Sequence, residues 1–430
     1  MKGPRIKLFP VYFIILLILT SSGCGDKKDS ATRLKFWAMG TEAEFVTKLV
    51  PEFQRRNPGI KVDVQQIPWN AAQEKLVTAF ASDNTPDICQ LGNTWIAQFA
   101  SLNAIISLDK YIADSPSINK ENYFTGVWDT NIIDSLVYGI PWYIDTRLMF
   151  YRTDVFKEAG YDEPPRSWGE LYDLCKKIKA LHRGEDKYAI YLPTNEWNPF
   201  IMFALENNAS LLKENNSRGN FDSKEFKEAF RYLTNFHKEK LAPLGISQVT
   251  NVYQAFVEEY FSIYISGPWN INEFKKWMTD DLAGKWSTAP MPSKNGDHYP
   301  GVSLAGGSSL VIFNNCKHIQ EAWKFIEFLS ETSTQLEFYH LLYNLPAVKK
   351  AWEDTSLANN KYMKAFRLQF ENVVATPKVP EWEQIAFAKV QQYAELVVRG
   401  AMTVDEAAKN LDKDVDKILE KRRWLLSRKK

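Results

Sequence analysis

The sequence predicts an α/β fold made of two lobes, each a mostly parallel sheet flanked by helices. Strand and helix patterns alternate in the first part of the chain, which favours right-handed crossovers between parallel strands. After removal of an export signal, about 400 residues remain, more than one hydrophobic core usually serves. Hydrophobic residues make up 45% of the chain and no low-complexity tract is present, so a packed rather than a disordered chain is expected.

Each element follows from its hydrophobic period. Residues 33–38 (RLKFWA) and 60–67 alternate polar and apolar side chains, as strands do, and residues 42–56 between them have helical spacing. Asn57-Pro58-Gly59 ends that helix. The same reasoning predicts strands over residues 87–91, 261–265 and 309–313, an extended aromatic stretch over 138–151, and helices over 71–80, 168–181, 223–238, 319–329, 384–398 and 404–423.

The N-terminus has the three-part layout of an export signal. Three basic residues precede an apolar run over residues 8–19, and small residues then lead to Cys24. That run is shorter than the roughly 20 residues of a membrane span. The ending resembles a lipobox, which implies lipidation of Cys24, although Ser21 stands where that motif usually has leucine. Residues 1–23 would then be the signal peptide and 24–33 a lipidated tether; plain secretion is the alternative.

Net charge and cysteine content argue against a nucleic-acid-binding protein and against a zinc protein. Loss of the signal lowers the 53 basic residues to 50 against 52 acidic ones. The mature chain therefore has no overall excess of positive charge that would indicate binding to nucleic acid or to an anionic surface. Cys89, Cys175 and Cys316 match no zinc motif and are expected to be buried thiols. Neither a metal site nor a cofactor is expected.

Several blocks of the mature chain resemble one family when they are taken together. They include PGIKVDVQQIPWN, TPDICQLGNTW, YGIPWYIDTRLMFYRTDVF, FSIYISGPW, APMPSKNG, PGVSLAGGSSLVIF, EAWKFIEFLS and TVDEAAKNLDKDV, in the family's order. The chain is similar to the extracellular solute-binding proteins of sugar ABC transporters (family 1), and especially to lipid-anchored trehalose and maltose binders. The resemblance implies a two-lobe periplasmic-binding-protein fold of type II with the ligand cleft between the lobes.

The resemblance also implies where the chain divides. Lobe one takes residues 34–142 and 308–331, and lobe two takes 143–302 and 335–430. Residues 303–307 form a hinge crossing. The implied function is the extracytoplasmic substrate-binding component of an ABC importer. It would bind a neutral sugar, a di- or oligosaccharide, and deliver it to the permease subunits. A monomer, lipid-anchored outside the cytoplasmic membrane (in the periplasm or on the cell surface), is expected.

Sugar chemistry points to particular side chains. A sugar ring has apolar faces and a rim of hydroxyls, so aromatic faces and carboxylates suit it, and charge-assisted hydrogen bonds are about twice as strong as neutral ones. Tyr143 and Asp145 stand two apart on an extended segment and therefore point the same way. The resemblance matches both to sugar contacts and Trp269 to a stacking tryptophan. Asp145 could instead only hold Arg147, and Trp269 could be a core residue.

Other candidates come mainly from the resemblance. In the first lobe Thr41 and Glu42 could contact the ligand or cap a helix, and Trp69 could be an aromatic platform or a helix staple. Glycine at 306 and 307 permits close backbone approach or forms a hinge. The family pattern adds Asn93, Thr94, Glu196, Trp197 and Tyr343. Thr376 stands where relatives have an arginine, and Trp382 could compensate by stacking.

An enzyme is the rival class. Asp145 and Glu196 could form the carboxylate pair of a cell-surface glycoside hydrolase, which in retaining enzymes stands roughly 5 Å apart. Another carbohydrate-binding lipoprotein is a further alternative. The chain carries no GxSxG, HExxH or GxxxxGK[ST] signature. We therefore expect a binding protein and no catalytic residues.

Overall fold

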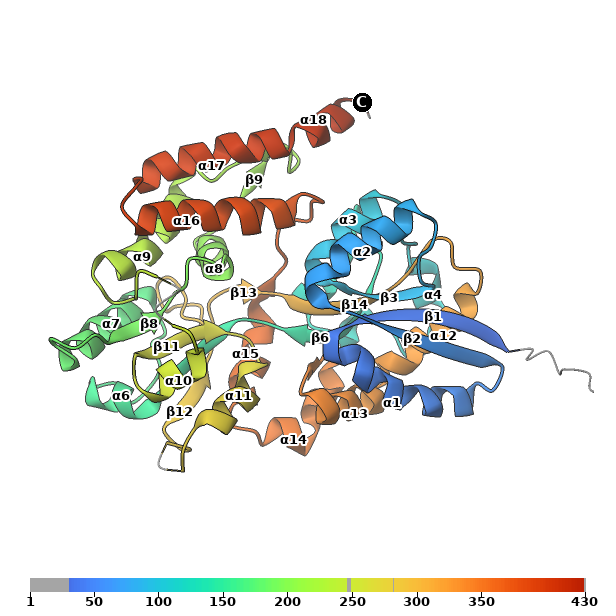
Figure 1. The fold of residues 1–430 in the computed structure, drawn as a ribbon, viewed down its shortest axis with the longest axis horizontal. Coiled ribbons are helices and arrows are strands. Elements are labelled where there is room, and N and C mark those ends of the chain that lie inside the picture. Colours follow the sequence, from blue (N-terminus) through green and yellow to red (C-terminus); the bar gives the residue numbers. More distant parts are fainter. Residues whose placement is uncertain (1–30, 246–248, 281, 429–430) are drawn as a thin grey trace, which may run out of the picture.

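The computed structural model describes residues 31–245, 249–280 and 282–428. The predicted signal peptide, residues 1–23, and residues 24–30 of the predicted tether lie outside the described residues. Two lobes, each built on its own sheet, stand side by side (Figure 1). Within the described ranges, no helix is long and apolar enough to cross a membrane.

Lobe one is built on a six-stranded sheet with the strand order β15-β6-β14-β3-β1-β2. β1 runs parallel to both β2 and β3, whereas β14 runs antiparallel to β3 and β6, and β15 antiparallel to β6. The strands are β1 (Thr32–Met39), β2 (Ile60–Ile67), β3 (Ile88–Gly92), β6 (Ile140–Asp145), β14 (Gly306–Ile312) and β15 (Leu345–Pro346).

Both faces of this sheet are covered by helices. Leu34, Phe36 and Ala38 of β1 point into one hydrophobic cluster, while Trp37 and Met39 point into another. α1, α5, α12 and α13 contribute to the first cluster, and α2 and α3 to the second (Figure 1). The helices are α1 (Gly40–Arg56), α2 (Trp69–Ala81), α3 (Ile96–Ser101), α4 (Asp109–Ala113), α5 (Thr125–Asp129), α12 (Ile319–Ser330) and α13 (Thr332–Leu342).

Lobe two is built on a four-stranded sheet with the order β12-β7-β11-β8. β11 is parallel to β8, but β7 is antiparallel to both of its neighbours. The strands are β7 (Leu148–Arg152), β8 (Tyr188–Tyr191), β11 (Phe261–Ser266) and β12 (Trp286–Ala289). The helices are α6 (Thr153–Glu158), α7 (Trp168–Leu181), α8 (Asn198–Glu206), α9 (Lys224–Lys238), α10 (Val252–Val257), α11 (Asn270–Trp277), α14 (Thr355–Ala358), α15 (Met363–Gln369), α16 (Gln391–Val398), α17 (Val404–Ile418) and α18 (Glu420–Ser427).

Small elements complete the chain between these helices and strands. β4 pairs with β5, β9 with β10, and β13 with β16. A π-helical segment over Gln384–Val390 runs directly into α16. The remaining short elements are β4 (Ile132–Ile133), β5 (Leu136–Val137), β9 (Leu212–Lys213), β10 (Arg218–Gly219), β13 (Ser303–Leu304), β16 (Val373–Val374) and the 3-10 turns Asn93–Trp95, Lys120–Asn122, Lys349–Glu353 and Phe370–Asn372.

The predicted mostly parallel sheets are therefore wrong in detail, although the two-lobe fold is confirmed. Only β2, β1 and β3 form a parallel set in lobe one, and both sheets are mixed. The cause is the path of the chain between the lobes. β6 carries it out of lobe one and β14 brings it back, so the two strands must lie antiparallel where they pair.

Two of the crossings are hydrogen-bonded to each other. The Thr146 hydroxyl lies 2.8 Å from the carbonyl oxygen of Leu304, and the Ser303 hydroxyl donates to the Arg147 carbonyl at 2.7 Å. The third crossing comes later than expected. α13 packs with α1, and β15 pairs with β6, so residues 332–346 belong with lobe one and the expected division at residue 335 is too early.

Most predicted elements are present, with three differences. The extended stretch over 138–151 is divided into β6 and β7 by Thr146 and Arg147. The helix over 384–398 begins as a π-helix, and the helix over 404–423 is divided at Leu419 into α17 and α18. Cys89, Cys175 and Cys316 are buried free thiols, as predicted.

Candidate functional site

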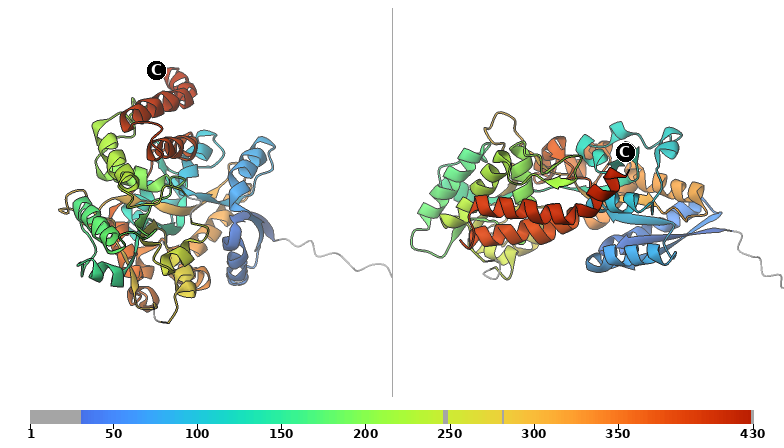
Figure 2. Two further views of the ribbon diagram at one scale, coloured as in Figure 1. Left: turned by 60° about the vertical axis from the view of Figure 1, so that its left-hand side comes forward. Right: turned by 90° about the horizontal axis from the view of Figure 1, so that it is seen from above.

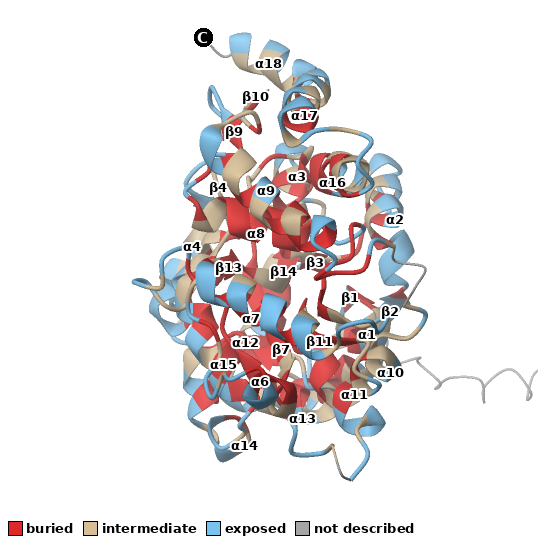
Figure 3. Ribbon diagram, turned by 90° about the vertical axis from the view of Figure 1, so that its left-hand side faces the viewer, coloured by how far each residue is buried: buried red, intermediate tan, exposed pale blue. Residues whose placement is uncertain are grey.

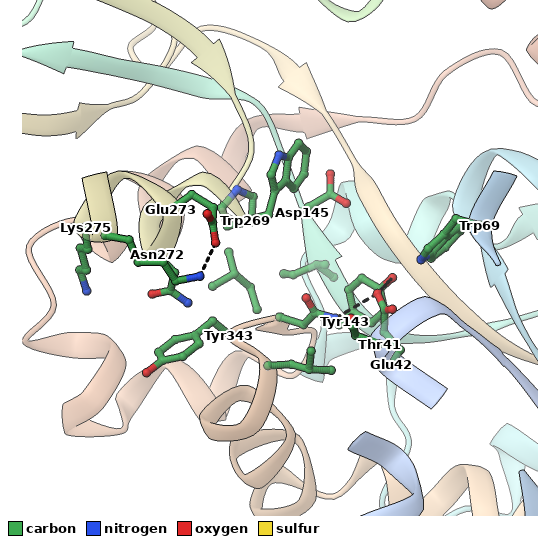
Figure 4. A pocket seen from close by; sticks show the side chains of 16 residues that line it. Thr41, Glu42, Trp69, Tyr143, Asp145, Trp269, Asn272, Glu273, Lys275 and Tyr343 are labelled. Carbon is green, nitrogen blue, oxygen red and sulfur yellow. Dashed lines mark hydrogen bonds and ion pairs between the residues drawn. The ribbon is translucent and has the colours of Figure 1, made fainter. Parts of the chain in front are cut away.

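A cleft lies between the lobes and consists of two adjoining cavities of about 880 Å³ and 620 Å³. Trp69, Tyr143 and Asp145 line both of them, so the cavities adjoin as one site. Figure 4 shows the side chains of the larger cavity. The predicted residues that line the larger cavity also include Thr41, Glu42, Trp269 and Tyr343. Those that line the smaller cavity also include Asn93, Thr94, Trp197, Gly306 and Gly307.

A hydrogen-bond network fixes Tyr143 at the centre of the cleft. Its hydroxyl donates to Glu42 Oε1 at 2.8 Å and accepts from Gln90 Nε2 and the Ser308 hydroxyl, each at 3.0 Å. Asn344 Nδ2 also donates to Glu42 Oε1, at 3.3 Å. Burial raises the pKa of Tyr143, and the nearby Glu42 carboxylate raises it further. Tyr143 therefore stays a neutral donor that holds the Glu42 carboxylate at the cavity wall.

Asp145 lies at the junction of the two cavities and is paired with a cation. Arg147 Nη1 donates to Asp145 Oδ1 at 2.6 Å, and the same guanidinium lies over the Trp269 ring, 4.6 Å from its centroid. Burial raises the pKa of Asp145, and the Arg147 guanidinium offsets part of that rise. Asp145 thus forms an ion pair with Arg147 and also lines the cleft. The ion pair uses Oδ1 alone.

Trp269 enters the cleft from lobe two. It is 49% exposed and stands immediately before α11, where Gly267 lets its ring fold back over the chain: a Cβ at Gly267 would lie 2.1 Å from the ring. The core alternative for Trp269 is therefore excluded. Figure 4 shows Trp269 near Asp145, with Trp69 of lobe one across the cavity.

Further aromatic rings line the cleft. Trp69 is 39% exposed and packs edge-to-face with Trp95, so it presents part of its ring to the cavity. Tyr343, in the left-handed conformation (φ 64°) at the end of α13, is also largely exposed. Trp197 is nearly buried, but its ring meets that of Phe387, which is exposed on the π-helical segment. These rings give the cleft flat apolar faces on both lobes.

Gly306 and Gly307 bring the backbone of β14 against β6. A Cβ at Gly306 would lie 2.2 Å from Asp145 Oδ1, and one at Gly307 would lie 2.3 Å from the Tyr143 carbonyl oxygen. Gly307 also has φ +111°. Both line the smaller cavity, so glycine is required here by strand packing as well as leaving backbone accessible to the cleft.

Polar side chains close the far end of the smaller cavity. Asn93 Nδ2 donates to the Gly306 carbonyl at 3.2 Å, and its Oδ1 accepts from the Ser309 hydroxyl at 3.1 Å, which fixes the end of β3 to β14. Thr94 of lobe one and Glu383, just before the π-helical segment, line this end of the cavity together. Burial raises the pKa of Glu383, and the Thr94 side chain offsets part of that rise.

Glu383 should reduce stability at neutral and alkaline pH. Because its folded-state pKa is raised above the ordinary 4.5, ionisation in the folded protein is unfavourable, and stability falls as pH rises through that window. We expect Glu383→Gln to be more stable than the wild type at pH 8, and the difference to vanish below about pH 4.5. Chemical denaturation at the two pH values measures this. Equal or lower stability of the variant at pH 8 would contradict the expectation.

Two predicted site residues do not line the cleft. Trp382 is fully buried in the lobe-two core, where its ring packs edge-to-face with Trp197, so the expected stacking on a ligand is wrong. Glu196 is exposed on a turn outside both cavities; its carboxylate accepts from Asn198 Nδ2 at 3.3 Å and Asn198 lines the cleft. Thr41 is not a helix cap either, because α1 begins at Gly40 with Met39 before it.

Several lining residues escaped the sequence analysis. Arg147 is predicted only as a partner of Asp145, Phe387 lies in the predicted helix over 384–398, and Glu383 lies just before that helix. Glu383 and Phe387 stand four residues apart, and an acidic and an aromatic side chain at that spacing lie on one side of a helix. This spacing is the sequence pattern that indicates a shared position for them in the site. The remaining new side chains are polar and comprise Asn70, Gln73, Asn198, Asn272, Glu273, Lys275 and Lys276.

Comparison with known proteins agrees with this architecture. The family model described as bacterial extracellular solute-binding protein matches residues 40–336. The sugar-binding protein MalE from Xanthomonas citri has a similar structure, with a TM-score of 0.89, 45% identity, and coverage of 92% of this chain and 99% of that chain. A solute-binding protein of an ABC transporter from Thermotoga lettingae, bound with alpha-D-tagatose, has a TM-score of 0.74 and 26% identity over 90% of this chain and 100% of that one.

A curated relative has a similar length and a related name. The diacetylchitobiose binding protein DasA of Streptomyces coelicolor is 23% identical over 451 residues, which cover 96% of this chain and 98% of the relative. The family match extends over well more than half of the chain, and the MalE structure covers nearly all of it. This chain belongs to the family of bacterial extracellular solute-binding proteins.

Proposed function

We propose that the protein binds a neutral sugar in the cleft between its lobes and serves as the substrate-binding component of an ABC importer. The observation that carries the proposal is a single cleft to which the two lobes contribute aromatic faces, Trp69 and Trp269, around the carboxylates Glu42 and Asp145. Sugar rings offer apolar faces to the former and hydroxyls to the latter. The sugar-binding relative at 45% identity supports the same reading.

The size of the cleft favours a di- or oligosaccharide. Drug-sized ligands occupy pockets of roughly 300–1,000 Å³, and the larger cavity alone has about 880 Å³ before the smaller one is added. A single ring between Trp69 and Trp269 would leave the cavity lined by Trp197 and Phe387 unfilled. We therefore expect di- and trisaccharides to bind more tightly than their component monosaccharides.

Thermal unfolding with a panel of mono-, di- and trisaccharides tests the binding proposal. A sugar at about 100 times its dissociation constant should stabilise the folded protein by about 2.7 kcal/mol. Charged compounds of similar size serve as controls. The absence of a shift with every neutral sugar, together with a shift for a charged control, would overturn the proposal.

Loss of Trp269 or of the Asp145 charge should weaken binding. Trp269→Ala removes an exposed aromatic face and is expected to cost about 1–3 kcal/mol of sugar affinity, by analogy with aromatic stacking on flat ligands. Asp145→Asn keeps a polar side chain but loses charge-assisted bonds. Isothermal titration measures both, and Trp277→Ala, an exposed tryptophan at the end of the same helix, is the control. Full affinity in both variants would place the sugar elsewhere.

We further propose that the protein binds without hydrolysing its ligand. Asp145 is held by Arg147, and Glu196, the second carboxylate considered for a glycosidase pair, lies outside the cleft. Related proteins are named for binding. Incubation with labelled oligosaccharides should return them intact, whereas cleavage that is lost in Asp145→Asn would establish a hydrolase.

Delivery to a membrane permease requires that the protein stays near the membrane. We propose a monomer that is lipidated at Cys24 after removal of residues 1–23, with the following residues as the tether. Because the lipid alone would anchor the chain, Cys24→Ala should move the protein from the membrane fraction to the medium or periplasm. Fractionation and immunoblotting measure this. Unchanged membrane retention of the variant would contradict lipidation at this residue.

A further inference from the structure

The last two helices carry a row of basic side chains on their outer surface. In α17 and at the start of α18, Lys409, Lys413, Lys417 and Lys421 follow one another at four-residue intervals, and all four are exposed. Within α17 that interval keeps Lys409, Lys413 and Lys417 on one slowly turning side, and Lys421 follows at the same interval beyond Leu419. α18 continues beyond α17 at the edge of the molecule, remote from the lobe-two sheet (Figures 1 and 2).

Several acidic residues of α17 are already bonded to other groups, although Asp405 and Glu406 are exposed and Glu420 is exposed at the start of α18. The Asp412 carboxylate accepts from the backbone N–H groups of Phe221 and Asp222. Asp414 pairs with Lys389 at 2.8 Å, and Asp416 pairs with Arg218 at 3.0 Å. The excess of positive charge is largest over residues 420–430, where six basic residues stand against Glu420 alone, although the whole chain is close to neutral.

α18 carries exposed apolar side chains next to exposed basic ones. Lys421, Trp424, Leu425 and Arg428 are spaced i, i+3, i+4 and i+7, so they share one side of the helix, and all four are exposed. Trp424 is 50% and Leu425 46% exposed, and the Arg428 guanidinium lies 3.8 Å from the centroid of the Trp424 ring. α18 has no buried residue (Figure 3).

The helix is nevertheless fixed to the protein. Arg423, on the other side of α18, donates to the carbonyl oxygens of Ser217 and Asp416 at 2.9 Å and 2.6 Å. The exposed side is therefore presented in a defined orientation. In the sequence, Lys429 and Lys430 follow and add two further positive charges.

We propose that this surface, formed by Lys409, Lys413, Lys417, Lys421, Trp424, Leu425 and Arg428, binds the anionic phospholipid surface of a membrane. Tryptophan has an apolar body and a polar N–H that suit the headgroup level of a bilayer, and leucine inserts beside it. Lysine and arginine extend their charged ends to lipid phosphates while their stems cover apolar surface. The surface is separate from the sugar cleft, so the contact does not depend on the proposed function.

Such a contact would orient the protein as well as retain it. The predicted tether between Cys24 and β1 spans about 3.3–3.6 Å per residue when extended, which leaves the domain free to turn. A second contact through α17 and α18 would limit that freedom. Membrane lipid suits this surface better than a protein partner does, because exposed apolar side chains, Trp424 and Leu425, lie directly among basic ones, as in helices that bind the bilayer interface.

Vesicle binding tests the proposal without the lipid anchor. The mature chain from residue 25, which contains every strand and helix of both lobes, is sedimented with vesicles of phosphatidylcholine alone or mixed with phosphatidylglycerol. We expect binding only to the anionic vesicles, decreasing with salt because the attraction is screened. In the triple variant Lys413→Gln, Lys417→Gln, Lys421→Gln, affinity should fall about fivefold per charge, on the order of a hundredfold in all. Trp424→Ala should also weaken binding.

A matched triple variant away from α17 and α18, Lys48→Gln, Lys110→Gln and Lys350→Gln, changes the same net charge at other exposed lysines and should retain vesicle binding. An unchanged unfolding transition in both triple variants shows that the fold is intact. Equal binding to both kinds of vesicle, no binding, or an equal loss in the two triple variants would overturn the proposal. So would retention only by membranes that contain the permease, which would assign the surface to a protein partner.

Discussion

Trp382→Ala should lower the free energy of unfolding by about 3–5 kcal/mol, the range for removal of a large buried aromatic side chain. Trp382 is fully buried in the lobe-two cluster and packs edge-to-face against Trp197. Alanine would leave a cavity behind the smaller part of the cleft. Urea denaturation followed by circular dichroism measures the change.

Two further variants make this prediction specific. Trp382→Phe keeps most of the bulk and removes an indole N–H that has no acceptor among the described residues, so its cost should be clearly smaller. Trp269→Ala removes a half-exposed ring and should affect sugar affinity much more than stability. A Trp382→Ala protein of wild-type stability with weakened sugar binding would instead restore the stacking role predicted from the sequence.

Gly307→Ala should be the second strongly destabilising change, by about 2–6 kcal/mol. The residue has φ +111°, and a Cβ would lie 2.3 Å from the carbonyl oxygen of Tyr143. Unfavourable backbone conformation costs about 1–3 kcal/mol and overpacking about as much again. Since β14 pairs with β6 here, the change should also displace Tyr143 and Asp145 and reduce sugar affinity.

Gly160→Ala separates the cost of backbone strain from the cost of the steric overlap of the added Cβ. Gly160 also has a positive φ, +82°, but a Cβ there meets no atom within 4 Å. Its replacement should therefore cost only the backbone strain, about 1–2 kcal/mol. Unfolding curves of the two variants give the difference. If Gly307→Ala cost no more than Gly160→Ala, the close approach of β14 to β6 would not be the reason for glycine at this position.

The sequence predicted elements whose pattern is local. β1 and β2 match their expected ranges closely because alternation reports burial directly, and α1 ends where Asn57-Pro58-Gly59 ends it. Strand direction, in contrast, could not be predicted from a local pattern. That β14 lies antiparallel between β3 and β6 depends on where the chain re-enters lobe one, and no local pattern in residues 306–312 records it.

The same contrast between local pattern and long-range contact applies to the residues of the candidate site. The two-residue spacing of Tyr143 and Asp145 on a strand predicts their common side, and the family resemblance predicts that this side faces the cleft. Trp382 could not be distinguished from a surface tryptophan, since its burial depends on Trp197, nearly two hundred residues earlier. Glu383 lines the cleft together with Thr94 of lobe one, nearly three hundred residues earlier in the chain. Family resemblance supplied no residue at that position.

The most direct test of the sugar-binding proposal is a crystal structure of the protein with the oligosaccharide that stabilises it most. We expect one ring against Trp269, hydroxyls within hydrogen-bond distance of Asp145, and a further ring toward Trp69 or Phe387, so that both lobes contact the ligand. Density for the sugar outside the cleft, or a ligand that contacts one lobe only, would contradict the account.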